Sequence, residues 1–204
     1  MNIILNFGLL SFVTHGLFDI LKYDKFFYKA LLLRYIVCIF LFMSVGYLSK
    51  YVLYLIFIFF SMFHFSLDFN KFGFGFLMLP LSALLYNDEW NIILKDQGIE
   101  DYEQITDITK MILIPGLFLT VFDPVLILIS VIISSINNFY GILAYLIMFH
   151  APLTIYRLGK LKNKDYFKLW FLVTFIISFF VKDVFIYKDY DILGISITLS
   201  HIIF

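Results

Sequence analysis

Apolar runs of about 20 residues recur along this chain, and they constrain its fold more than any other feature. A helix that crosses the hydrocarbon core of a bilayer needs about 20 mostly apolar residues. Inside that core every backbone polar group must be paired within the protein, which favours helices. Runs that we expect to span a membrane lie near residues 2–21, 30–49, 51–69, 111–136, 138–156 and 167–181.

Two further segments are shorter. Residues 72–86 contain Gly73, Gly75 and Pro80 and predict a re-entrant or short span, whereas residues 192–204 form a helix of roughly 20 Å, too short to cross alone. The dipeptide 123–124, Asp-Pro, interrupts the run 111–136 and predicts a kink. We expect an all-α fold, a polytopic transmembrane helix bundle with about 6–8 membrane segments, and a single integral membrane domain over residues 1–204.

Composition agrees with this class of protein. The chain is 62% hydrophobic with a mean hydropathy of +0.95, far above the apolar share of soluble domains. Its 15 basic and 15 acidic residues cancel, so there is no electrostatic case for binding nucleic acid. The single cysteine, Cys38, excludes an internal disulfide and a cysteine-based metal cluster. The first apolar run lacks a basic start and a small-residue cleavage site, so we expect a retained helix in a cell membrane or another membrane.

Three histidines lie inside the apolar runs, at His15, His64 and His150. Ionisable side chains are costly in hydrocarbon, so those kept at membrane depth are candidates for function. Asp19 and Asp68 each follow a histidine by four residues, a spacing that puts both side chains on one helix face. The pattern predicts a buried metal site in which the histidines are ligands and catalytic residues. The aspartates orient them as hydrogen-bond acceptors or act as ligands themselves.

The loops suggest a common depth for these histidines. Basic residues gather between 22 and 29 and between 157 and 168, and basic loops prefer the cytoplasmic side. Both loops reach that side if 72–86 dips in and returns, or if 111–136 is broken into a hairpin. The three imidazoles then share one layer. The acidic stretch from Asp88 to Asp107 is expected to be a loop.

Other residues are candidates for the surroundings of the site. His201, three residues from the end of the sequence, is a further metal ligand or a histidine at a frayed terminus. Gly16 permits close backbone approach beside His15. Together with Phe65, Tyr145 and Thr154, it is a candidate for the pocket that receives substrate or O₂.

At these residues the chain resembles the Brp/Blh family of membrane β-carotene 15,15′-dioxygenases. That family has an HGxxD motif in its first helix, an HF motif followed by Asp in a later helix, and then two histidines four residues apart. Residues 15–19, HGLFD, match the first motif, and residues 64–68, HFSLD, match the second with Ser66 where glycine is usual. His150 matches the first histidine of the pair, but Thr154 stands where the family has its second. The resemblance covers the order of motifs along most of a chain that is short for the family.

The resemblance implies a non-haem Fe(II) centre that uses O₂ to cleave the central 15,15′ double bond of β-carotene, or a related carotenoid, into retinal. Retinal in turn implies a rhodopsin as an indirect downstream user. The departure at Thr154 implies either a site completed by His201 or an aspartate, or an altered or lost activity. The spacing of the histidines and aspartates alone predicts only a metal site inside a membrane. A bis-histidine haem protein and a proton- or metal-coupled transporter remain alternatives.

Overall fold

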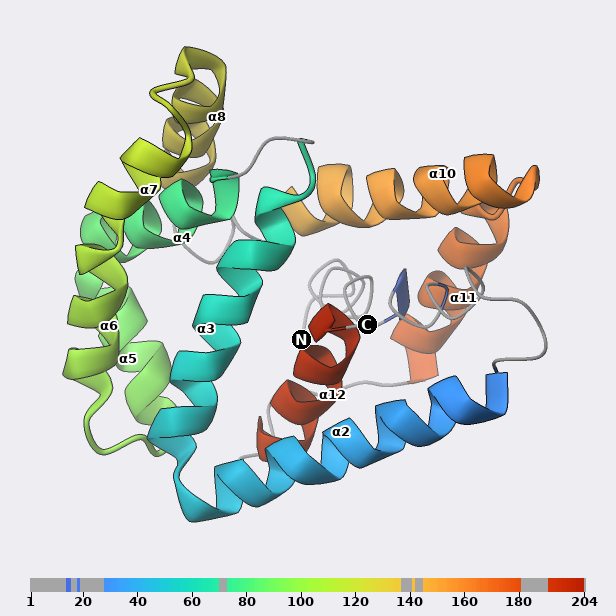
Figure 1. Ribbon diagram of the computed structural model, residues 1–204, viewed down its shortest axis with the longest axis horizontal. Helices are drawn as coiled ribbons and strands as arrows, with labels where there is room; N and C mark the ends of the chain where they lie inside the picture. Colours follow the sequence, from blue (N-terminus) through green and yellow to red (C-terminus); the bar gives the residue numbers. More distant parts are fainter. Residues whose placement is uncertain are drawn as a thin grey trace.

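The structure is a computed structural model that describes residues 14–15, 18, 28–69, 73–136, 141, 145–180 and 191–203. Every element in this part of the chain is helical, which confirms the all-α prediction. The helices surround a central region that holds α12 and the short segment at residues 14–15 (Figure 1).

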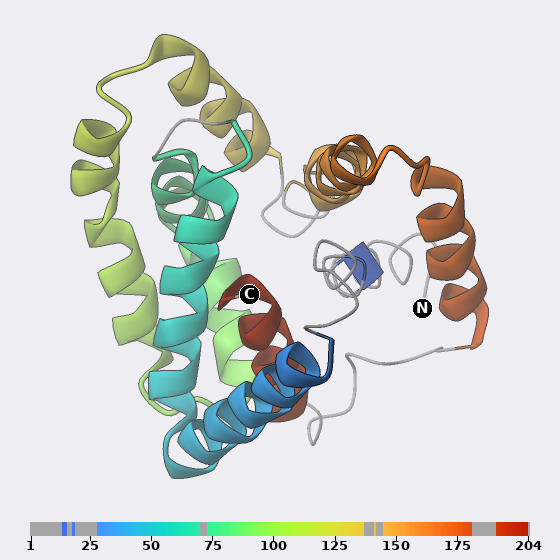
Figure 2. The same cartoon turned by 45° about the vertical axis from the view of Figure 1, so that its right-hand side comes forward.

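Helices α2 (Tyr28–Leu48) and α3 (Lys50–Ser66) meet at Ser49, which caps α3 by accepting a hydrogen bond from the Val52 N–H at 3.3 Å. Helix α12 (Asp191–Ile203) packs against both of them (Figures 1 and 2). The C-terminal helix is therefore packed between two long helices.

On the far side of α3, helix α4 (Phe74–Leu85) is the centre of a second layer. It packs against α3, α6, α7 and α8. Gly75 makes the contact with α3 possible, because a Cβ there would lie 2.1 Å from the carbonyl oxygen of Met62. This close approach holds α4 against α3 at Met62, two residues before His64.

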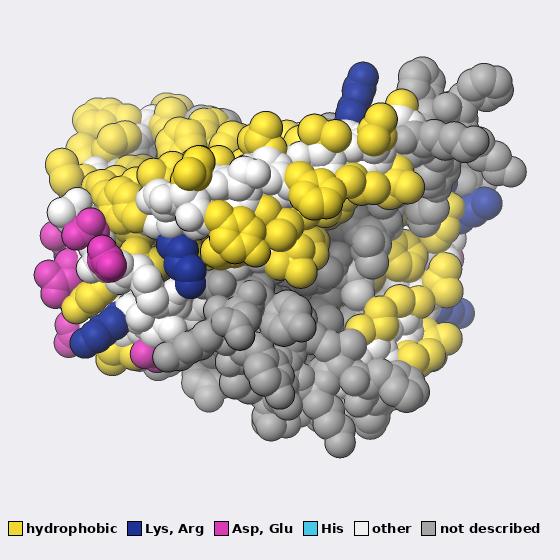
Figure 3. All heavy atoms as spheres, turned by 90° about the horizontal axis from the view of Figure 1, so that it is seen from below, with side chains coloured by type: hydrophobic (Ala, Val, Ile, Leu, Met, Phe, Trp, Pro, Cys, Tyr) yellow, Lys and Arg dark blue, Asp and Glu magenta, His cyan; other side chains and the backbone are white. Residues whose placement is uncertain are grey.

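The acidic stretch Asp88–Asp107 is mostly helical, which corrects the expectation of a loop. It forms α5 (Asn87–Asp96) and α6 (Tyr102–Met111), which pack against each other. Both helices are amphipathic: Trp90, Leu94 and Ile105 are buried, whereas the acidic side chains gather at one end of the molecule (Figure 3). The sequence prediction followed the charge and overlooked the apolar residues at helical spacing.

The run 111–136 is divided where Asp123-Pro124 interrupts it. Helix α7 (Leu113–Leu119) ends before a turn in which Val121 and Phe122 have φ of 50° and 51°, and α8 (Pro124–Ser135) follows. The Asp123 carboxylate caps α8 by accepting from the Val125 N–H at 3.0 Å. The outcome is two helices that both pack against α4, and not one kinked helix.

The remaining helices lie on the opposite side of the centre, where one turns away from the end of the other at a wide angle (Figures 1 and 2). A π-helical turn, η3 (Leu146–His150), leads into α10 (Ala151–Lys162), which packs against α11 (Phe167–Phe180). Phe18 packs with buried residues of α10 and α11, and Thr14 Oγ1 lies 2.7 Å from Thr174 Oγ1. The segment that carries His15 is thereby held against α11.

The expected six to eight membrane-crossing helices are not found among the described residues. No helix in this part of the chain combines the length and the apolar character that crossing a membrane requires. One reason is visible in the run 111–136, where the turn at residues 120–123 leaves two pieces of 7 and 12 residues.

Candidate metal centre

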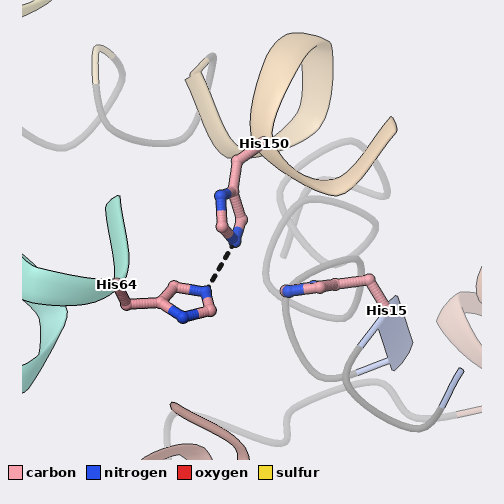
Figure 4. A group of neighbouring side chains, drawn as sticks. All are labelled: His15, His64 and His150. Carbon is pink, nitrogen blue, oxygen red and sulfur yellow. Dashed lines mark hydrogen bonds between the residues drawn. The ribbon is translucent and has the colours of Figure 1, made fainter. Parts of the chain in front are cut away.

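Three histidines from distant parts of the chain meet at the centre of the molecule. His15 comes from the N-terminal segment, His64 from α3 and His150 from the last position of η3 (Figure 4). Each offers a ring nitrogen, and these nitrogens all lie within 4.8 Å of one another. His15 and His150 are 0% and 1% exposed, and burial favours the neutral form of imidazole, the form that binds metal ions.

His201 of α12 joins this group. Its Nε2 lies 3.1 Å from Nε2 of His15, and its ring centroid lies 5.4 Å from that of His64. The rings of His15 and His150 are 4.8 Å apart, as are those of His150 and His64, whereas His15 and His64 lie farther apart at 6.4 Å. The nitrogens of His15, His64 and His150 therefore form one group, and His201 lies beside it against His15 and His64.

The spacing of the nitrogens fits one ion. Two imidazole nitrogens bound to an ion at about 2.1 Å and at a right angle to each other are about 3.0 Å apart. The Nε2 atoms of His64 and His150 are 3.0 Å apart, and those of His15 and His201 are 3.1 Å apart. Neutral imidazoles without thiolates suit iron, zinc, copper or nickel. The described residues can thus hold a metal ion of this group.

Asp68 supports this group from a position that the sequence did not predict. Its Oδ2 accepts a hydrogen bond from Nδ1 of His150 at 2.6 Å, whereas the spacing along the chain pointed to His64. Helix α3 ends at Ser66, so Asp68 lies in the following turn and no longer shares a helix face with His64. With Nδ1–H bound to the carboxylate, Nε2 of His150 keeps its lone pair for a metal ion.

Two residues hold Asp68 in this place. The hydroxyl of Tyr145 donates a short hydrogen bond to Oδ2 of Asp68. Arg157 of α10 donates to the backbone carbonyl of Asp68 at 2.5 Å and so attaches the turn to α10. Tyr145 and Asp68 are each 4% exposed, which makes the carboxylate dependent on these protein partners.

The π-helical turn that carries His150 has a local cause in the sequence. Pro152 has no backbone N–H, so the α-helical hydrogen bond from residue 152 to Met148 cannot form. The N–H of Ala151 instead reaches the carbonyl of Leu146, five residues back. The π turn is therefore a local departure from regular α-helical hydrogen bonding. Such turns are frequent at functional sites.

Aromatic side chains cover one side of the histidines. Phe65 meets the His150 ring edge-on at 5.1 Å and lies 5.7 Å from Tyr145. Phe149 stacks on Phe69 at 4.8 Å and on Tyr145 at 5.7 Å. The centre therefore has a wall of packed aromatic side chains on this side.

The other predicted residues are placed as follows. Phe65 is buried beside the site, Tyr145 is the partner of Asp68 and not an open pocket residue, and Thr154 is partly exposed on α10. Gly16 and Asp19 lie outside the described residues. Sequence reasoning missed the contact of Arg157 with the turn at Asp68. It also missed the hydrogen bond from Tyr145, for which the only signal was its position five residues before His150.

Comparison of the chain with models of protein families, with curated protein sequences and with solved structures gave no match.

Proposed function

We propose that this protein is an iron-dependent dioxygenase that cleaves the central 15,15′ double bond of β-carotene, or of a related carotenoid, to give retinal. The observation that supports it most is the convergence of His15, His64 and His150 from three separate segments, with Asp68 on the outer nitrogen of His150. These are the residues on which the resemblance to the Brp/Blh family rests.

Iron is the ion that we propose for this site, on the resemblance to the Brp/Blh family. His15, His64 and His150 would hold the ion and leave coordination positions open, as O₂-activating Fe(II) sites require. When bound, Fe(II) would supply the activation of O₂. In the overall reaction the double bond breaks and each of its two carbons receives one oxygen atom of O₂. No external reductant is needed.

The chain's own residues would exclude water and orient the substrate. The aromatic side chains of Phe65, Phe69 and Phe149 would supply apolar surface against which a planar polyene packs. Asp68 would hold the His150 ring in one orientation, so that the position of the cleaved bond is defined relative to the ligands.

We also propose that the molecule is embedded in a lipid bilayer, where carotenoids dissolve. Soluble monomers rarely expose large continuous apolar patches. Here apolar side chains cover much of the face in Figure 3. On α2, α8 and α11 the exposed ones include Leu32, Leu33, Val37, Phe40, Leu41, Leu128, Ile132 and Leu172, each at least half exposed.

The haem alternative fits the geometry less well. The two axial nitrogens of a bis-histidine haem lie about 4 Å apart, twice a metal–imidazole bond, with the macrocycle between them. In both close pairs the nitrogens are only 3.0–3.1 Å apart. These distances favour a metal ion bound by histidines without a porphyrin.

Expression in bacterial cells that make β-carotene tests the proposal. We expect the orange colour to fade and retinal to accumulate, measured by chromatography, with iron bound to the purified protein. His64→Ala should abolish both product and iron. Ser130→Ala, which removes a buried hydroxyl on α8 outside the histidine group, should leave them unchanged. Persistent colour with folded, iron-loaded protein would contradict cleavage of β-carotene.

A further inference from the structure

We infer that His201 is a fourth ligand of the same metal ion, so that the C-terminal helix closes a site begun by the N-terminal segment. The inference rests on the metal centre of the proposed function and adds a ligand to it. His201 belongs to no histidine motif in the sequence, and no spacing pattern connects it with His15, His64 or His150.

The position of the ring is the first argument. His201 is 6% exposed, and its Nε2 is directed at Nε2 of His15, 3.1 Å away. This distance matches two adjacent ligands of one ion. The contact repeats the 3.0 Å pair of His64 and His150, so the four nitrogens form two similar pairs.

The packing of α12 is the second argument, because it shows that His201 is not a histidine at a frayed helix end. Leu199 is fully buried, and it shares a cluster with Phe42 of α2 and Leu53 of α3. The hydroxyl of Tyr35 on α2 donates to the carbonyl of Ile197 at 3.2 Å. Contacts with two other helices therefore bring the ring of His201 to the centre.

The grouping of the four imidazole rings is the third argument. A hydrogen bond between His15 and His201 would use one N–H and one lone pair, and would need no other histidine. In the structure the rings of His15 and His201 lie 4.7 Å apart, and each also lies near His64. An ion bound by the group of His15, His64 and His150 and also by His201 would account for both close nitrogen pairs at once.

Cobalt(II) is a suitable probe, since it binds imidazole sites and reports its ligands by absorption. A thiolate bound to cobalt produces a ligand-to-metal charge-transfer band that imidazole ligands do not. We expect His201→Cys to bind Co(II) and to gain this band. The matched control is Ser200→Cys, one residue earlier and about 100° around the helix, which should bind Co(II) without the band. The native Cys38 is present in all samples and provides the background.

Metal affinity is the second measurement, and it remains decisive if the cysteine variant does not fold. His201→Gln retains a polar side chain of similar size. Loss of a supporting partner alone weakens metal binding about 10–100-fold, so loss of a direct ligand should weaken Fe(II) or Co(II) binding by about 100-fold or more. Circular dichroism checks that the helices are retained.

The outcomes separate the two proposals. Wild-type protein that binds neither Fe(II) nor Co(II) would overturn the metal centre and the fourth ligand together. Wild-type protein that binds one ion, with no charge-transfer band in His201→Cys and unchanged affinity in His201→Gln, would overturn only the role of His201.

Discussion

The carboxylate of Asp68 accepts a hydrogen bond from Nδ1 of His150, 82 residues further along the chain, although Asp68 lies only four residues after His64. Two side chains four residues apart lie on the same face only if one helix continues through both residues. Helix α3 stops at Ser66, so the side chain of Asp68 points out of the following turn toward another helix. A motif that looks local in the sequence therefore connects two segments.

Replacing Asp68 with Asn should weaken metal binding by about 10–100-fold, because a neutral amide orients the ring of His150 less strongly than a carboxylate. The affinity can be measured by competition with a chelator. Asp107→Asn is the control, since Asp107 is 66% exposed and pairs only with Lys110 on the same helix. Equal affinities in the two variants would contradict a supporting role for Asp68.

Tyr145→Phe should lower the free energy of unfolding by about 1–3 kcal/mol, because a buried carboxylate loses a donor. Metal binding should weaken less than in Asp68→Asn, since the bond to His150 remains. The control is Tyr86→Phe, whose hydroxyl donates to the Ser135 carbonyl at 2.8 Å at an exposed site. Thermal unfolding followed by circular dichroism gives the comparison, and a larger loss in Tyr86→Phe would contradict the assignment.

Pro152→Ala should reduce metal affinity by about tenfold without loss of helix stability. Alanine restores the N–H that an α-helix uses at this position, so the π turn is no longer required and the ring of His150 shifts from its place. Pro124→Ala is the control, because Pro124 begins α8, where the N–H has no partner within the helix. Unchanged affinity in Pro152→Ala would show that the proline does not position His150.

Gly75→Ala should destabilise the fold by about 3 kcal/mol, because the new Cβ would lie 2.1 Å from a backbone oxygen of α3, which cannot move alone. Gly46→Ala on α2 is a matched control. Its Cβ would meet side-chain atoms of Ile192 and Leu53 at 2.7 and 2.8 Å, and side chains can shift more readily than the backbone of a packed helix. The gain in helix propensity of about 1 kcal/mol applies to both. Unfolding midpoints should therefore fall much further for Gly75→Ala.

Much of the fold could be predicted from residue order alone. The apolar runs near 30–49, 51–69 and 167–181 correspond closely to α2, α3 and α11. The interruption at Asp123-Pro124 was also placed correctly, because capping and the lack of a proline N–H act over a few residues. The helices α5 and α6 were missed because their charged residues outweighed a few buried apolar ones.

For the candidate site too, one part could be predicted from the sequence and another could not. The sequence determined which side chains carry the chemistry, since histidine and aspartate stand out in apolar surroundings whatever the arrangement of the helices. Only the tertiary structure decided the pairs: Asp68 with His150, Tyr145 with Asp68, and His201 with His15. The spacing of residues along the sequence indicates only which side chains share a face of the same helix. Contacts between helices depend on where each helix ends and how closely it packs, which the whole fold sets.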